Sequence, residues 1–252
     1  MSARALAVAV PGRRLVSGLD IDLKAGEFVA LLGQNGAGKT LTLLTLAGLR
    51  VPEAGRVSFD ARPIGDWNRR QLARRLGMLP QDSEDVFPTT VFETALIGRH
   101  PHLGLLELDS ENDRNETLAA LRAVGLEQLA RRDVATLSGG ERRRLAIAQI
   151  LTQAPGVFLL DEPLNHLDPQ HQLEILELFR QLARSGSSVV ASLHDPNLAR
   201  RYADRALLLF GDGRWLFDDV DRVLTAETLS EVYSVRMESV PWRDGNLFVA
   251  TK

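Results

Sequence analysis

The feature that most restricts how this 252-residue chain can fold is a glycine-rich loop between a strand-like run and a helix-like run. Its sequence is Gly33-Gln34-Asn35-Gly36-Ala37-Gly38-Lys39-Thr40, which follows the pattern G-x-x-x-x-G-K-[ST]. Glycines let the backbone curl until several N–H groups point at one phosphate, and the following helix adds its positive end. The pattern predicts that residues 33–41, Leu41 included, contact a triphosphate, with Lys39 supplying charge and Thr40 a hydroxyl for Mg²⁺. The alternative is a glycine turn before an ordinary helix.

Three short apolar runs predict buried strands, at residues 27–32, 157–160 and 188–193. Near-continuous apolar runs of this length are typical of parallel strands that helices cover on both faces. In such sheets, ligands gather beyond the carboxyl ends of the strands. The glycine-rich loop follows the first run, an acidic pair ends the second, and His194 follows the third. The sequence therefore predicts an α/β fold with a mostly parallel sheet and a site along one edge.

The acidic pair, Asp161 and Glu162, ends the second apolar run. A carboxylate at the end of a buried strand can hold Mg²⁺ directly or through water, which we expect of Asp161. The next carboxylate, Glu162, can polarise a water that attacks a phosphate. The alternative is a strand that emerges into solvent with two surface acids, and the glycine-rich loop in the same chain argues against it.

Between residues 83 and 137 the strand-like runs vanish, and helical spacing at 91–99 and 111–124 indicates a helical insertion. Further helices are expected at 71–76, 197–202 and 225–233. Further strands are expected at 56–60, near Met78, at 206–210 and at 214–217, the last two flanking a turn at Gly211 and Gly213.

A second glycine-containing segment, Leu137-Ser138-Gly139-Gly140-Glu141, precedes an amphipathic run. Ser138 and Glu141 have the spacing of a capping box, which would start a helix. Paired glycines at a helix N-terminus also make an anion site suited to a γ-phosphate. The two interpretations are compatible, and the pattern alone favours neither.

The segment LSGGE followed by RRRLAIAQIL resembles the signature motif of ABC ATPases, and other motifs of that family appear in family order. Gln81 in MLPQD matches the Q-loop glutamine, Asn165-His166-Leu167-Asp168 resembles the D-loop, and His194 in SLHD matches the switch histidine. The resemblance spans roughly residues 5–220. It implies a P-loop NTPase (RecA-like) core at 1–82 and 143–220 with a small N-terminal antiparallel β region. It also implies a helical subdomain at 83–142 and a C-terminal extension at 221–252.

The resemblance also implies ATP, Mg²⁺ and a head-to-tail dimer of two copies. Each ATP would lie between the phosphate loop of one copy and the signature segment of the other: Ser138, Gly139, Gly140 and Glu141, with Asp168 nearby. Glu162, His194 and Gln81 would be catalytic, and Thr40, Gln81 and Asp161 would hold the metal. The signature helix end would stabilise charge in trans, as an arginine finger does in other P-loop enzymes.

The chain departs from the family pattern at the adenine site. Family members usually place an aromatic residue in the first strand, where this chain has Val10. Weaker stacking follows, unless Arg13 or Arg14 replaces the aromatic. Gln34 and Leu41 stand where proline and a second Ser or Thr are common, and neither change removes a phosphate or metal ligand.

The rest of the sequence bears on the type of ABC machine. No apolar run reaches the roughly 18–20 residues that cross a bilayer, and a net charge of -3 gives no reason to expect nucleic acid. The run IGRHPHLG, at residues 97–104, is similar to one in haem, cobalamin and ferric-siderophore importer motors, as is the tail at 223–235. This resemblance implies a homodimeric permease, indirectly a periplasmic substrate-binding protein, and a peripheral location on the cytoplasmic face of the inner membrane. The alternative is a soluble single-cassette ATPase that acts with a scaffold, as in iron–sulfur cluster assembly.

An apolar set beside Gln81 is the expected contact for a short helix of the permease: Val86, Phe87, Val91, Phe92 and Leu96. The competing interpretation is ordinary packing between helices.

Overall fold

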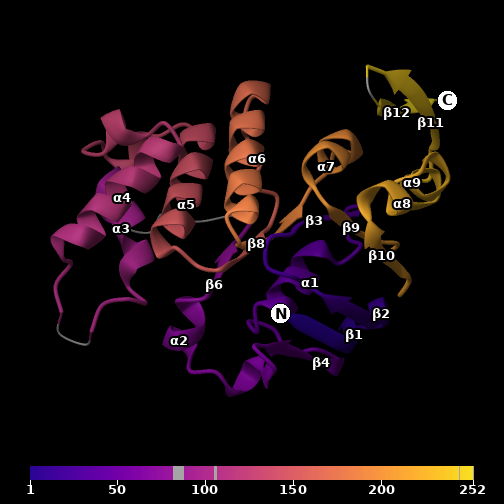
Figure 1. The fold of residues 1–252 in the computed structure, drawn as a ribbon, viewed down its shortest axis with the longest axis horizontal. Coiled ribbons are helices and arrows are strands. Elements are labelled where there is room, and N and C mark those ends of the chain that lie inside the picture. Colours follow the sequence, from indigo (N-terminus) through magenta and orange to yellow (C-terminus); the bar gives the residue numbers. More distant parts are fainter. Residues whose placement is uncertain (82–87, 105–106, 244, 252) are drawn as a thin grey trace.

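The computed structural model describes residues 1–81, 88–104, 107–243 and 245–251, and it is built around a six-stranded sheet (Figure 1). The strand order is β10-β9-β3-β8-β7-β6, in which β10 is antiparallel to β9 and the other neighbours are parallel. The strands are β3 (Phe28–Gly33), β6 (Leu76–Leu79), β7 (Val157–Leu160), β8 (Ser188–Ser192), β9 (Arg205–Leu209) and β10 (Trp215–Asp219). The predicted α/β fold with a mostly parallel sheet is confirmed.

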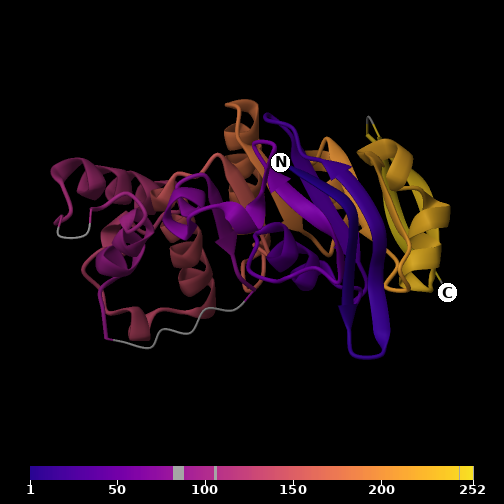
Figure 2. The ribbon, with the colours of Figure 1, turned by 90° about the horizontal axis from the view of Figure 1, so that it is seen from below.

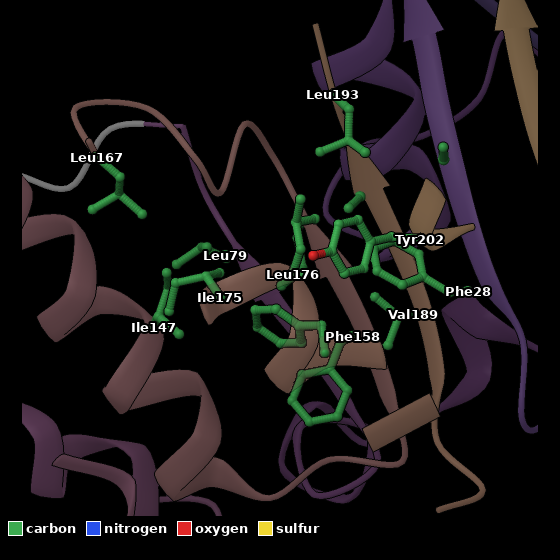
Figure 3. Close-up of a cluster of buried hydrophobic side chains, with 14 of the residues drawn as sticks. Phe28, Leu79, Ile147, Phe158, Leu167, Ile175, Leu176, Val189, Leu193 and Tyr202 are labelled. Atoms are coloured by element: carbon green, nitrogen blue, oxygen red, sulfur yellow. The ribbon is translucent and has the colours of Figure 1, made fainter. Parts of the chain in front are cut away.

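The central strands of this sheet are mostly apolar because both of their faces are buried, whereas the edge strand β10 ends in Asp218 and Asp219. Phe28, Ala30 and Leu32 of β3 join the hydrophobic cluster on one face, whereas Val29 and Leu31 join the cluster on the other. Side chains of α5 (Gly139–Gln153), α6 (Pro169–Arg184) and α7 (Pro196–Tyr202) join the first cluster, and side chains of α1 (Lys39–Leu46) join the second. Figure 3 shows the first cluster, where side chains from strands and helices interdigitate. Alternation between two buried faces thus accounts for the runs from which the strands were predicted.

A smaller antiparallel sheet covers the second face, as the family resemblance implied. Its order is β2-β1-β4-β5, with β1 (Ser2–Val10), β2 (Arg13–Asp22), β4 (Ala54–Phe59) and β5 (Arg62–Pro63). Helix α1 (Lys39–Leu46) shares a core with it, and the strand expected at 56–60 is β4.

The helices α3 (Val91–Leu96), α4 (Glu111–Ala123) and α5 (Gly139–Gln153) pack together at one end of the molecule, away from the C-terminal hairpin (Figures 1 and 2). Helix α5 is continuous across the expected boundary between residues 142 and 143, and the division of the chain into subdomains stays a prediction. The remaining helices are α2 (Arg69–Ala73), α6 (Pro169–Arg184), α7 (Pro196–Tyr202), α8 (Val220–Val223) and α9 (Ala226–Tyr233). Short 3₁₀ turns lie at Ile64–Asp66, Ile97–Arg99, Glu127–Leu129 and Val134–Thr136.

A C-terminal hairpin, β11 (Arg236–Trp242) and β12 (Gly245–Thr251), was not predicted from the sequence. Pro241 interrupts the first strand, and the pair has little of the apolar alternation that marks a half-buried hairpin. The hairpin is instead held from outside: Asn197 of α7 exchanges two hydrogen bonds with the backbone of Phe248, at 2.8 and 3.2 Å. In the described part of the chain, no helix has both the length and the apolar character that a membrane crossing requires.

The helical region contains a buried ion pair between Arg99 and Asp113. Arg99 Nε donates to Asp113 Oδ1 at 2.8 Å, and Nη1 donates to the carbonyl of Thr152 at 3.0 Å. Hydrogen bonds from the hydroxyl and backbone N–H of Ser110, and then from Arg99, lower the pKa of Asp113 to about 2. The ion pair therefore joins α4 to the 3₁₀ turn at Ile97–Arg99, and Arg99 joins both to the end of α5.

We expect the substitution Asp113→Asn to lower the free energy of unfolding at neutral pH by about 2 kcal/mol or more. Because the pKa in the folded state lies below the ordinary 3.8, the stabilisation is complete above 3.8 and is lost as the pH falls toward about 2. Urea unfolding at neutral pH and in acid measures both effects. The variant should lose this part of the acid dependence, and an unfolding free energy equal to that of the wild type at neutral pH would contradict the prediction.

Candidate active site

The order of the parallel strands gathers four loops at one edge of the large sheet. The neighbours β3, β8, β7 and β6 end next to one another, and their carboxyl ends lead into the phosphate loop, His194, the acidic pair and Gln81 respectively. A cavity of about 290 Å³ lies between these loops. Its lining residues are Asn35, Gly36, Gly38, Lys39, Thr40, Leu41, Gln81, Glu162 and His194. The structure therefore brings together residues that lie far apart in the sequence and that were singled out as candidates.

The phosphate loop needs glycine at its first and last turns. A Cβ on Gly33 would lie 2.6 Å from the carbonyl oxygen of Leu209, and Gly38 has φ of +102°. Gly38 caps α1, and among the described residues no side chain caps this end of the helix. The first N–H groups of α1 are therefore open to an anion. The remaining loop residues flank this point: Ala37 is buried, and Gln34 is exposed and donates to Ser234 Oγ at 3.4 Å.

The side chain of Lys39 is folded back over the loop. Its Nζ donates to the carbonyl oxygens of Gly33 at 2.8 Å and Gln34 at 3.3 Å, and the residue is only 6% exposed. Burial lowers the pKa of Lys39, and the carboxylates of Glu162 and Asp161 oppose that shift. An ammonium group held by two neutral carbonyls is poorly compensated, so a phosphate beside it would be a stronger partner.

Asp161 is fully buried at the end of β7 and uses only one of its carboxylate oxygens. Oδ1 accepts a hydrogen bond of 2.7 Å from Ser192 Oγ, whereas Oδ2 has no hydrogen-bond partner among the described residues. A buried carboxylate oxygen without a donor is unfavourable unless a cation or water completes it. The set of oxygen atoms fits Mg²⁺, because Asp161, directly before the lining residue Glu162, and the lining residues Thr40 and Gln81 offer the oxygen ligands that this ion prefers.

Glu162 has a strained backbone that its neighbours fix in place. Its φ of +48° lies in the left-handed region, which costs roughly 1–2 kcal/mol for a residue with a Cβ. The backbone N–H donates to Ser192 Oγ at 2.7 Å. The carboxylate lies 2.9 Å from His194 Nε2 through Oε1 and accepts from Asn165 Nδ2 through Oε2. The side chain thus stands in the cavity wall with its acceptor atoms oriented, as a base that activates water requires.

The signature segment lies outside this cavity. The predicted capping box is confirmed, since Ser138 Oγ accepts from the N–H of Glu141 at 3.2 Å and Glu141 Oε2 accepts from the N–H of Ser138 at 2.7 Å. Ser138 and Gly139 are exposed, and a Cβ on Gly140 would lie 2.9 Å from the carbonyl oxygen of His166. These residues are therefore not brought to the phosphate loop of their own chain.

Asp168 is also outside the cavity, where it caps α6. Its carboxylate accepts from the backbone N–H of His171 at 2.9 Å and lies 2.8 Å from His171 Nδ1. These contacts, the backbone hydrogen bond first, lower the pKa of Asp168. The predicted D-loop residue is thus an exposed carboxylate at a helix start.

Sequence reasoning missed three residues that support the site: Ser192, Asn165 as a partner of Glu162, and Arg143. Ser192 had a signal, since it is a polar residue directly after the buried apolar run Val189, Val190 and Ala191. Arg143 had none, because it is the middle residue of an Arg-Arg-Arg run in which only the fold separates the buried side chain from its neighbours.

Comparisons with known proteins agree with this geometry. Residues 16–165 match the family model described as ABC transporter. The chain is 41% identical over 246 residues to the hemin import ATP-binding protein HmuV of Rhodopseudomonas palustris, covering 94% of this chain and 89% of the relative. A solved structure of a metal-chelate type ABC transporter, in an inward-facing conformation, has a TM-score of 0.86 at 28% identity, covering 100% of this chain and 97% of that one. A dimeric ATP-binding cassette in a post-hydrolysis state, bound to ADP and Pi, has a TM-score of 0.73 at 25% identity, covering 87% and 98%.

Proposed function

This chain belongs to the ABC transporter family, and from that premise we propose that it is the ATP-hydrolysing subunit of an importer whose cargo is hemin. The observation that carries the chemistry is one cavity lined by the phosphate loop and the Glu162–His194 pair, with the buried Asp161 directly before Glu162. The likeness to hemin import proteins over most of both chains supports the cargo. The subunit would sit peripherally on the cytoplasmic face of the membrane, beneath a permease that a periplasmic binding protein supplies.

The residues of the cavity divide the chemistry of ATP hydrolysis between them. The open N–H groups of α1 and the ammonium group of Lys39 bind the β- and γ-phosphates. Glu162 accepts the proton of the attacking water, and His194 holds the carboxylate and the terminal phosphate in place. Asp161, Thr40 and Gln81 would hold Mg²⁺, which supplies positive charge against the phosphate oxygens.

The signature segment would complete the site of a second copy. Ser138, Gly139, Gly140 and Glu141 form a helix N-terminus that lies outside the cavity of their own chain, and Ser138, Gly139 and Asp168 are exposed. A helix N-terminus binds anions, so the second copy can place this end against the γ-phosphate. ATP would therefore close two copies head to tail, and hydrolysis would release them.

The adenine base would find little to stack on. Val10 is 37% exposed at the end of β1, and among the described residues that line the cavity none is aromatic. Arg14 is paired with Glu53 at 2.9 Å. Arg13 donates to the carbonyl of Gly211 at 2.7 and 3.1 Å, which holds its guanidinium beside the end of β9. Of the two arginines proposed from sequence, only Arg13 is held next to the phosphate loop, because a Cβ on Gly211 would lie 3.1 Å from both Arg13 Nη2 and Ala37 Cα.

We therefore expect weak discrimination between adenine and guanine nucleotides, because most of the contacts that hold the nucleotide would be made to its phosphates. The kcat/KM for GTP should lie within about tenfold of that for ATP, measured by phosphate release from each nucleotide. A GTP-to-ATP ratio below roughly a few hundredths would contradict this expectation. Arg13→Ala should raise the KM for both nucleotides, and Arg14→Ala, at the neighbouring arginine, is the matched control.

A groove next to Gln81 is the surface on which we place the permease. It has a volume of about 410 Å³ and lies between α2 and β6 on one side and the 3₁₀ turn at Ile97–Arg99 and α5 on the other. Its apolar lining includes Met78, Pro80, Ile97 and Ile150, and Ile97 is 42% exposed.

The apolar set expected from sequence is only partly available for such docking. Val91 is fully buried and Phe92 packs against the core, so both belong to helix packing. Leu96 is partly buried, and Val86 and Phe87 lie outside the described residues. The groove around Ile97 is therefore the better candidate for an amphipathic helix of the permease.

Co-expression with hemin permease candidates tests the proposal. We expect a complex that co-purifies, hydrolyses ATP faster than the isolated subunit, and takes up hemin in reconstituted vesicles. Ile97→Asp should break the complex while leaving nucleotide binding intact, and Leu216→Asp, at a 39% exposed leucine of β10, is the matched control. Stable association only with soluble cluster-assembly proteins would favour the scaffold alternative instead.

A further inference from the structure

One arginine joins the signature helix to both loops that carry the proposed catalytic groups. Arg143 lies in α5, five positions after Ser138, and is only 5% exposed. Its guanidinium donates to backbone carbonyls of two segments, one that follows β6 and one that follows β7. Those segments carry Gln81 and Glu162. Arg143 therefore hydrogen-bonds α5, which packs with α3 and α4, to two segments that line the cavity.

The hydrogen bonds spread over the whole guanidinium fork. Nη1 donates to the carbonyl oxygens of Pro80 at 2.8 Å and Gln81 at 3.1 Å. Nη2 donates to the carbonyl of Glu162 at 2.8 Å and to that of Asp161, and Nε donates to Pro163 at 3.4 Å. A planar group with donors on three nitrogens can hold both segments at once, whereas an ammonium group acts as a single point.

The contact at Glu162 falls where the backbone is strained. Glu162 has φ of +48°, so its carboxylate keeps its direction only if the surrounding peptide units are fixed. Ser192 Oγ fixes the N–H side at 2.7 Å, and Arg143 fixes the carbonyl side at 2.8 Å. Without Arg143, the carbonyl side of Glu162 would lose a charge-assisted hydrogen bond in a buried place.

We propose that Arg143 is a positioning residue for ATP hydrolysis: it holds the backbones of Gln81 and Glu162 at the distance and direction that the water-activating step requires. The inference rests on the proposed role of Glu162. The hydrogen bonds of Arg143 described above all go to backbone carbonyls of residues 80–81 and 161–163 and none to the phosphate loop, so we expect its loss to act on the chemical step more than on nucleotide binding. The same helix then serves two sites, because it presents Ser138 to the other copy and orients the carboxylate of its own.

The test compares Arg143→Ala and Arg143→Lys with Arg144→Ala. Arg144 is the next residue of α5 and donates to the carbonyls of Val124 at 2.9 Å and Gly125 at 3.4 Å, so it controls for loss of an arginine from this helix. We expect Arg143→Ala to lower kcat by about a hundredfold with the KM for ATP changed by less than about threefold. The kcat of Arg143→Lys should lie about tenfold above that of Arg143→Ala and about tenfold below that of the wild type, because an ammonium group can hold one of the two segments but not both. Arg144→Ala should keep the wild-type kcat.

Two outcomes would overturn the inference: a wild-type kcat in Arg143→Ala, or a fall in kcat that Arg144→Ala reproduces. If Arg143→Ala does not fold, Arg143→Lys decides, and a wild-type kcat in that variant overturns the inference equally. Glu162→Gln distinguishes a failure of the proposed function of Glu162 from a failure of the proposed role of Arg143. Wild-type turnover in Glu162→Gln would remove the proposed function of that carboxylate. An inactive Glu162→Gln together with a fully active Arg143→Ala would remove only the role of Arg143.

Discussion

Replacing Glu162 with Gln should lower ATP turnover by about 10²–10⁴ while ATP remains bound. The amide has the shape of the carboxylate but cannot accept the proton of the attacking water. The residues that would hold phosphate and Mg²⁺ are unchanged, so nucleotide affinity should persist. Because hydrolysis is what opens the closed pair, the variant should accumulate as an ATP-bound dimer. Phosphate release and light scattering on a sizing column measure the two effects.

The control for this variant is Glu177→Gln, the same change on the exposed face of α6, where Glu177 accepts from Gln181 at 3.2 Å. It should keep wild-type turnover and stay monomeric under the same conditions. If Glu162→Gln turned ATP over at the wild-type rate, the water-activating group would have to be sought elsewhere in the cavity wall.

Replacing Lys39 with Ala should weaken ATP binding by at least about a hundredfold. The ammonium group is buried, with a pKa lowered by burial, and donates to two neutral carbonyls. The phosphates would be the stronger partner of this ammonium group. Removing it takes away a positive charge beside the phosphates, which carry the negative charge of the nucleotide. Titration with a fluorescent ATP analogue gives the dissociation constant, and thermal unfolding without nucleotide shows that the variant folds. Unchanged affinity would contradict the assignment of the phosphate loop.

The part of the site that was predictable from sequence is the part that local chemistry determines. The phosphate loop, Asp161, Glu162 and His194 each follow a short apolar run, and parallel strands place such positions at one edge. The capping box of Ser138 and Glu141 depends on four consecutive residues and was predicted for the same reason.

What was not predictable depends on contacts between distant segments. Arg143 sits among arginines that look identical in sequence, and only the packing of α5 turns it toward the carbonyls beside Glu162. Val91 was expected on a docking surface or in a helix core, and its burial places it in the core. The C-terminal hairpin depends on Asn197 of α7, which no local pattern in residues 236–251 reveals.

The claim on which the mechanism depends is that each nucleotide is held by the phosphate loop of one copy and the signature segment of another. Ser138→Arg should keep ATP binding but abolish turnover, since an arginine at this exposed helix start blocks the contact with the other copy. Lys39→Ala should be inactive for the separate reason given above. Neither variant alone can form one complete site in a dimer of two identical copies.

Mixing the two inactive variants therefore tests the claim most directly. In a mixed dimer, one site combines the intact phosphate loop of the Ser138→Arg copy with the intact signature segment of the Lys39→Ala copy. An equal mixture should recover ATP turnover, up to about a quarter of the wild-type rate if each intact site works independently. Turnover that stays at the level of the separate variants, in a mixture shown by crosslinking to contain mixed dimers, would contradict a site shared between copies.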